Sequence, residues 1–197
     1  MKSTFPGQVI GWVRAPLAML VVMTLILGGV YPLLVSGLAM VLFPAQAAGS
    51  LIVDNGTVAG SALIGQAFDA PDYFWGRLSA TTPPYNGSAS SGSNFGPLNP
   101  DLKRAIQSRV DALHAADPAN PDQIPMDLVT SSGSGLDPHI SPAAAIYQIS
   151  RVAHARGITV ERLRTLVDEY TEGRTLGVLG EPRVNVLLLN RALDAVR

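Results

Sequence analysis

The feature that most constrains the fold is a long apolar stretch near the N-terminus. Residues 15–43 are apolar apart from a few hydroxyl side chains, and no charged residue occurs between Arg14 and Asp54. At about 1.5 Å per residue, a helix of this length exceeds the ~30 Å hydrocarbon thickness of a bilayer and can span it with tilt. The sequence therefore predicts one transmembrane helix over residues 15–43.

A cleaved signal peptide is the alternative interpretation of this stretch. Ala45-Gln46-Ala47 resembles a cleavage site with small residues. The apolar region of a signal peptide, however, spans about 7 to 15 residues, and residues 15–43 form a block nearly twice that long. We therefore favour an uncleaved membrane anchor.

The charges that flank the apolar stretch predict its orientation. Lys2 and Arg14 precede it, and no Lys or Arg follows until Arg77. By the positive-inside rule, residues 1–14 are cytoplasmic and residues 44–197 lie outside the membrane. The sequence thus predicts a single-pass protein with one extracytoplasmic domain.

Small residues recur within the predicted helix. Gly28, Pro32 and Ser36 fall at intervals of four residues, with Gly29 and Gly37 beside them. Such a stripe allows a second membrane helix to approach closely, although glycine and proline are also ordinary in membrane helices. Pro32 is expected to kink the helix, because proline removes a backbone hydrogen bond.

The rest of the 197-residue chain is long enough for one domain with its own core. Asp54-Asn55-Gly56 has the sequence of a hairpin turn, and residues 124–129 read as a short strand. Capping residues and apolar periodicity predict helices that are segregated from the strands, over residues 100–116, 142–156, from 160 to about 170 and from about 185 onward. This arrangement predicts an α+β fold.

A loop rich in glycine and hydroxyl groups leads into the second of these helices. Thr130, Ser132 and Ser134 supply hydroxyls, and Asp137 and His139 follow. The loop ends at a helix N-terminus, which attracts anions, so these residues form a candidate functional loop. An ordered turn before a well-capped helix explains the same pattern.

Catalytic and metal sites are not predicted. Ser134, Asp137 and His139 have the residue types of a hydrolase triad, but Ser134 lacks the Gly-x-Ser-x-Gly context of a nucleophile. The three histidines lack the close spacing of a metal site, and no phosphate-binding loop for ATP is present. The net charge of −1 and the interspersed charges exclude a nucleic-acid surface.

Several motifs, in order along the chain, are shared with one known family. They are Gly28-Gly29-Val30-Tyr31-Pro32, Trp75-Gly76-Arg77, Ser79-Ala80-Thr81, Gly92-Ser93-Asn94, Asn99-Pro100, residues 129–148, Arg151-Val152-Ala153 and Gly180-Glu181-Pro182. Together they resemble the C subunit of the Kdp potassium-transporting ATPase over nearly the whole chain.

The resemblance implies an accessory subunit of a bacterial inner-membrane complex that imports potassium with high affinity. Its partners are then a P-type ATPase subunit that hydrolyses ATP, a channel-like subunit that translocates potassium and a very small membrane subunit, besides membrane lipid. The resemblance further implies a chaperone-like role that raises the ATP affinity of the hydrolysing subunit. ATP and potassium are handled by the complex, and no cofactor is bound stably by this chain.

The resemblance also implies that Gln148 contacts nucleotide, which conflicts with the predicted orientation, since ATP is cytoplasmic. In the physical alternative, the outer domain covers the potassium entrance. Oxygen atoms around 130–134 or 94–99 then face the ion, because potassium takes oxygen ligands. A free-standing, membrane-anchored module that binds a ligand outside the cell is a further alternative, and a secreted hydrolase is another.

Overall fold

The computed structural model describes residues 6–54 and 56–196, with side chains from residue 12 onward. Lys2 and Asn55, on which parts of the sequence predictions depend, lie outside the described residues. The chain divides into two compact units, of which the first ends at Ser50 and the second begins at Leu51.

The first unit is helical. It consists of α1 (Pro6–Leu25), a π-helical turn η1 (Ile26–Val30), α2 (Tyr31–Leu42) and the short α3 (Pro44–Ala47). The helical stretch Trp12–Leu42 is long and apolar enough to cross a membrane, and none of it is buried within the unit. An apolar surface without a core to cover suits a helix that faces lipid or other membrane helices.

The π-helical turn lies directly before Pro32. A proline inside an α-helix lacks an N–H donor and its ring clashes with the carbonyl four residues earlier, here that of Gly28. In the observed turn, the Tyr31 N–H donates to the Ile26 carbonyl, five residues back. The irregularity expected from Pro32 thus takes the form of a single wider turn, which makes room for the proline ring.

The second unit is α+β, as predicted. Its strands are β1 (Leu51–Asp54), β2 (Thr57–Ser61), β3 (His139–Ile140), β4 (Thr171–Glu172) and β5 (Arg183–Asn185). β1 and β2 form an antiparallel hairpin, and β3, β5 and β4 form an antiparallel sheet in that order. The helices are α4 (Pro100–Ala116), α5 (Met126–Val129), α6 (Pro142–Arg156), α7 (Val160–Glu169) and α8 (Val186–Ala195).

Most of the predicted elements are present, and one is wrong. The predicted helices begin at their capping residues: Asn99, Ser141, Thr159 and Asn185 each accept a backbone N–H from the first turn. The strand predicted over residues 124–129 is instead the short helix α5. Pro125 fixes φ at −59° and cannot donate to a strand ladder, which favours a helical turn after it.

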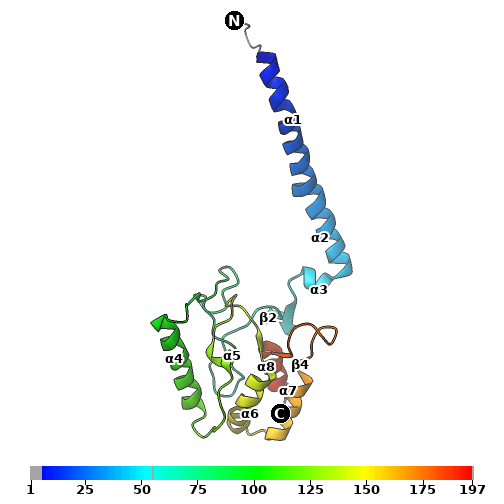
Figure 1. The fold of residues 1–197 in the computed structure, drawn as a ribbon. Helices are drawn as coiled ribbons and strands as arrows, with labels where there is room; N and C mark the ends of the chain where they lie inside the picture. The colour runs from blue at the N-terminus through cyan, green and yellow to red at the C-terminus, as the bar shows by residue number, and fades with distance from the viewer. Residues whose placement is uncertain (1–5, 55, 197) are drawn as a thin grey trace. The chain divides into compact units, whose positions relative to one another are not determined.

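The core of the second unit is built around α6. In Figure 1, α4 lies on one side of this unit and α7 on the other, with α5 and α6 between them. Buried apolar side chains from α6, α7, α8 and β5 form one cluster, which includes Ala144, Ile149, Val152, Leu163, Val167, Leu189, Leu193 and Val184. Phe74 and Trp75, from a segment without regular structure, complete this cluster.

The polar run before α4 is folded, although its composition also fits a disordered linker. Residues 79–99 contain no helix or strand, yet they pack against the turn at 131–135. The Ser79 hydroxyl donates to the Gly135 carbonyl over 2.7 Å, and the Ser91 N–H donates to the Ser134 carbonyl over 3.0 Å. The run is therefore an ordered part of the domain that packs against this turn.

Candidate functional site

An irregular segment crosses the core without a neighbouring strand. We call residues 70–77 the central segment; Phe74 and Trp75 within it are buried. Backbone groups buried away from water need hydrogen-bond partners. Each carbonyl from Ala70 to Arg77 accepts a bond from a side chain. Side chains thus replace the sheet ladder that this segment lacks.

Two buried amides hold the middle of the central segment. Gln148 on α6 accepts from the Trp75 N–H over 2.8 Å and donates to the Trp75 carbonyl over 3.1 Å. Asn190 on α8 does the same for Phe74, with both distances 2.9 Å. Each amide side chain reproduces the pair of bonds that a neighbouring strand would make.

Three arginines hold the ends of the central segment. Arg151 donates to the carbonyls of Tyr73, at 3.0 Å, and Pro71. Arg156 donates to the Asp72 carbonyl and Arg109 to the Gly76 carbonyl, both over 2.8 Å.

Two of these guanidinium groups also contact the ring of Trp75. Arg109 lies 4.9 Å and Arg151 4.6 Å from the ring centre, within the range of cation–π interaction. Burial lowers the pKa of Arg151 to about 10, so the group remains charged at neutral pH. The charge is therefore kept in the core by carbonyl dipoles and an aromatic face.

Gln148 has no hydrogen-bonding capacity left in this structure. Besides the two bonds to Trp75, its oxygen accepts from Arg151 over 2.7 Å and its nitrogen donates to the Ala144 carbonyl over 3.2 Å. Both donor hydrogens and both acceptor lone pairs are thus used by the protein. The nucleotide contact implied by the resemblance stays a prediction, and it requires these bonds to open.

Hydroxyl groups of the candidate functional loop shape the loop itself. The Thr130 hydroxyl donates to the Met126 carbonyl over 2.9 Å. Ser132 accepts from the Gly135 N–H over 2.9 Å, and Ser134 accepts from the Leu136 N–H over 3.1 Å. Gly135 has φ +69°, and a Cβ there would lie 2.6 Å from a backbone carbonyl, so the turn requires glycine.

Asp137 ties the end of this loop to the central segment. Its carboxylate accepts from Arg77 over 3.1 Å and from the His139 N–H over 3.0 Å. Burial disfavours ionisation of this carboxyl, but the hydrogen bonds from His139 and Arg77 outweigh burial and lower its pKa. The Ser134 hydroxyl is bonded within the turn and not to His139.

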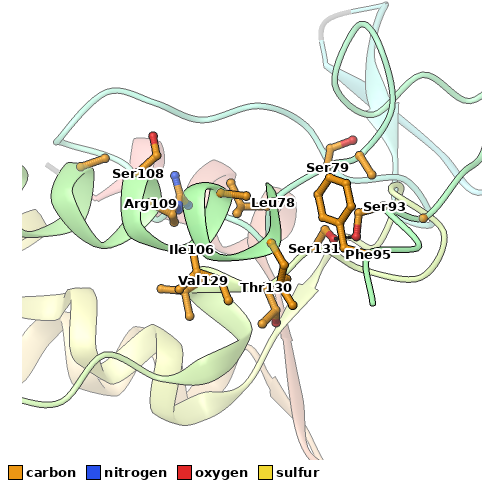
Figure 2. Close-up of a pocket in the computed structure, with 15 residues that line it drawn as sticks. Leu78, Ser79, Ser93, Phe95, Ile106, Ser108, Arg109, Val129, Thr130 and Ser131 are labelled. Atoms are coloured by element: carbon orange, nitrogen blue, oxygen red, sulfur yellow. Dashed lines mark hydrogen bonds between the residues drawn. The ribbon is translucent and has the colours of Figure 1, made fainter. Parts of the chain in front are cut away.

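A cavity of about 590 Å³ lies beside α4. It is lined by apolar residues of α4 and by the loops that contain Leu78, Phe95 and Val129. Residues with hydroxyl groups also line it: Ser79, Ser93, Ser108, Thr130 and Ser131. Figure 2 shows Arg109 and Ser108 toward one end and Phe95 and Ser93 toward the other.

The residues of the candidate loop are divided between two cavities. Thr130 lines the cavity beside α4, whereas Asp137 and His139 line a second one of about 300 Å³ with Arg77 and Arg183. Ser132 and Ser134 line neither. Among residues 6–54 and 56–196, no cluster of three or more His, Asp or Glu side chains is placed to hold a metal ion.

Sequence reasoning missed the side chains that hold the central segment. Gln148 and Arg151 occupy the apolar stripe of α6, where Ala144 and Val152 are buried. A polar residue on a buried stripe needs a buried hydrogen-bond partner, so the sequence of α6 already indicated that such partners exist. The partner itself lies 73 residues away in the chain and has no local pattern.

Three glycines of the apolar helix, Gly28, Gly29 and Gly37, have open space beside them among the described residues. A Cβ added at Gly29 or Gly37 would meet no atom within 4 Å, and one at Gly28 would meet only Thr24, at 4.0 Å. Pro32, Ser36 and Gly37 lie in α2, beyond the π-helical turn that contains Gly28 and Gly29. The open space on this helix leaves room for a second helix.

Comparison with known proteins confirms the family. A family model described as "K+-transporting ATPase, c chain" matches residues 13–195. A protein of Herpetosiphon aurantiacus is 62% identical over 93% of this chain and 96% of its own length, and one of Methylococcus capsulatus is 62% identical over 93% and 97%. A protein of Burkholderia mallei is 57% identical over 100% of this chain and 98% of its own length. All three carry the name potassium-transporting ATPase KdpC subunit, and the chain belongs to this KdpC family of potassium-transporting ATPase subunits.

Proposed function

We propose that this chain is an accessory, non-catalytic subunit of an ATP-driven, high-affinity potassium import complex. Its family makes it a component of a potassium-transport complex. The observation that supports an accessory role is the central segment, whose holding side chains, Gln148 and Asn190 among them, direct their polar atoms inward. A domain fixed in this way is a rigid body suited to stabilising an assembly.

The partners in this proposal are a P-type ATPase subunit, a channel-like potassium-translocating subunit and a very small membrane subunit. The stretch Trp12–Leu42 anchors the chain in the bacterial inner membrane, and the open faces at Gly29 and Gly37 receive a partner's helix. We expect Gly29→Leu to weaken recovery of the chain with its partners in detergent. Ala39→Leu, on the same helix, is the control.

The proposal is tested by removing the chain from cells that depend on this transporter. Growth at limiting potassium and recovery of the other subunits as one complex should both be lost, and the full chain supplied separately should restore them. Intact transport and assembly without the chain would contradict the accessory role.

The proposed orientation places the second unit outside the cytoplasm. The charge distribution supports it, since Arg14 precedes the membrane stretch and Arg77 is the first basic residue after it. Protease added to spheroplasts should digest the domain after Gly49, and inverted vesicles should protect it. The opposite pattern would reverse the orientation and favour direct contact between Gln148 and ATP.

An effect on ATP affinity is indirect in this orientation. It passes through the membrane helix or the partners, and the filled hydrogen-bonding capacity of Gln148 supports this route. The KM for ATP of the assembled complex should rise when the membrane stretch of this chain is replaced by an unrelated apolar helix. An unchanged KM would exclude a route through the membrane helix.

We also propose that the candidate functional loop lies near the potassium entrance. Thr130 supports this, because it lines the cavity beside α4. Alanine at Thr130, Ser132 and Ser134 should lower the affinity of transport for potassium. Unaltered affinity would show that the loop does not lie near the path of the potassium ion.

A free-standing ligand-binding module is the second candidate function, and the cavity of about 590 Å³ is the observation that favours it. Such a module should be monomeric and stable when purified alone in detergent, without other transport subunits. Stable recovery with large membrane subunits would exclude it.

A further inference from the structure

A hairpin arm extends from the sheet between β4 and β5. We use this name for residues 172–183, whose base is the pairing of Glu172 with Arg183. Within the arm, Thr175 and Leu179 form a second bridge, with N–H to carbonyl distances of 2.9 Å in both directions. Figure 1 shows this arm, in orange to brown, standing out from the body of the second unit. The arm is thus a structured extension of the sheet.

The tip of the arm is apolar and exposed. Leu176 is 86% exposed, Val178 71% and Leu179 59%. Single exposed apolar residues are common on protein surfaces, but three together at the end of an arm mark a contact site. The domain's own core does not use these side chains.

Leu176 also has a backbone conformation that leucine rarely adopts. Its φ is +54°, and that of the next residue, Gly177, is +77°. A tight turn with two left-handed residues favours Asn-Gly or Gly-Gly, because a branched side chain crowds the backbone there. Leucine at this position neither stabilises the turn nor makes the surface more soluble. We therefore expect its side chain to contact another molecule.

The charges of the arm indicate what that contact is. Arg174 pairs with Glu181 at 2.6 Å and Arg183 with Glu172 at 2.8 Å, so the two acidic and two basic residues balance. Binding to an anionic lipid surface relies on surplus Lys or Arg, which the arm lacks. An apolar tip next to paired charges instead resembles a protein interface, which has an apolar anchor at its centre and polar residues around it.

The rigidity of the arm favours the same partner. Backbone hydrogen bonds within the tip and its root in the three-stranded sheet order the backbone that carries the apolar side chains before any contact forms. An anchor that is already ordered loses less entropy when it enters a pocket. We propose that the tip, Leu176 to Leu179, inserts into an apolar pocket on another subunit of the potassium-transporting ATPase. This inference rests on the proposed function as a complex subunit.

The test replaces Leu176 in the full chain, co-expressed with the other subunits. Leu176→Asn removes the apolar anchor but suits a left-handed residue, so the thermal stability of the chain in detergent should stay the same or rise. Its dissociation from the purified complex should be roughly tenfold faster than for the unaltered chain. Leu63→Asn, at a leucine that is 62% exposed outside the arm, is the matched control and should dissociate as the unaltered chain does.

A photo-crosslinking residue at position 176 identifies the neighbour, and an adduct with another subunit is the expected result. An adduct with lipid, no protein adduct, or unchanged dissociation of Leu176→Asn overturns the inference while leaving the proposed function intact. Failure of the unaltered chain to purify with any other subunit overturns the proposed function itself, and this inference with it.

Discussion

The central segment and the candidate functional loop are both irregular, but they are held in different ways. Side chains of α4, α6 and α8, more than 30 residues away in sequence, hold the central segment through Arg109, Gln148 and Asn190. The loop hydroxyls of Thr130, Ser132 and Ser134 instead bond to backbone atoms within four residues. The comparison separates side chains that hold distant backbone in place from side chains that shape only their own turn, although the backbone of the loop also accepts a bond from Ser79 and one from Ser91. Changes to the former should therefore cost more stability.

Gln148→Ala should have the largest effect. It leaves the Trp75 N–H and carbonyl without partners in the core and takes one acceptor from Arg151. Each buried group left unsatisfied costs about 1–3 kcal/mol, so we expect a loss of about 3–5 kcal/mol in the free energy of unfolding. Urea unfolding of the full chain in detergent micelles measures it.

Gln148→Ala also distinguishes the two roles of this residue. Unchanged stability with a raised KM for ATP in the assembled complex would contradict the structural role and favour direct nucleotide contact. Lost stability with a normal KM in the complexes that still assemble would support the role described above. Gln107→Ala on α4, at an exposed glutamine, is the control for the substitution.

Arg151→Lys should have the next largest effect. Lysine keeps the charge but cannot donate to Pro71, Tyr73 and Gln148 in the planar geometry of a guanidinium, and it contacts the Trp75 ring less well. We expect a loss of about 2–3 kcal/mol, measured as for Gln148→Ala. Arg164→Lys, on the exposed side of α7, should change stability by less than about 0.5 kcal/mol. Equal losses of stability from the two substitutions would show that Arg151 does not hold the central segment in the way described.

Asp137 joins the two regions, and its ionisation should contribute an intermediate, pH-dependent effect. Because its pKa is lowered in the folded state, the unfolded chain binds the proton more readily, and the stabilisation is present above about pH 4. It is lost as the pH falls through the lowered pKa. Asp137→Asn should therefore flatten the fall in stability between about pH 5 and pH 2, measured by thermal unfolding. A profile identical to that of the unaltered chain would show that the contacts of Asp137 do not favour its ionised form.

Ser134→Ala should have the smallest effect. It removes one exposed, local bond to the Leu136 N–H, whose donor turns to water. The expected loss is below about 1 kcal/mol in the same unfolding assay. A loss as large as that for Gln148→Ala would mean that the Ser134 hydroxyl does more than shape its own turn.

The sequence predicted best what depends on neighbouring residues. The apolar stretch, the caps at Ser141 and Thr159, and the left-handed Gly157 at the end of α6 follow from local chemistry, and the structure contains each of them. The helix α5 was missed because Pro125 outweighed an apparent strand pattern. The contacts of Gln148, Arg109 and Asn190 could not be predicted, since their partners are brought close only by the folded chain.

The π-helical turn determines in which directions the residues of α2 face relative to those of α1. A single such turn accommodates one extra residue, so α1 and α2 face the directions expected of an α-helix one residue shorter. Deleting Gly29 should remove the extra residue and keep Ser36 in the same direction, while the ring of Pro32 then lies against the carbonyl four residues earlier and bends the helix. Deleting one residue elsewhere, such as Val35, should rotate the following residues by about 100°. The turn is thus a place where the apolar helix can lose a residue and still keep the side chains of α2 in their directions relative to α1.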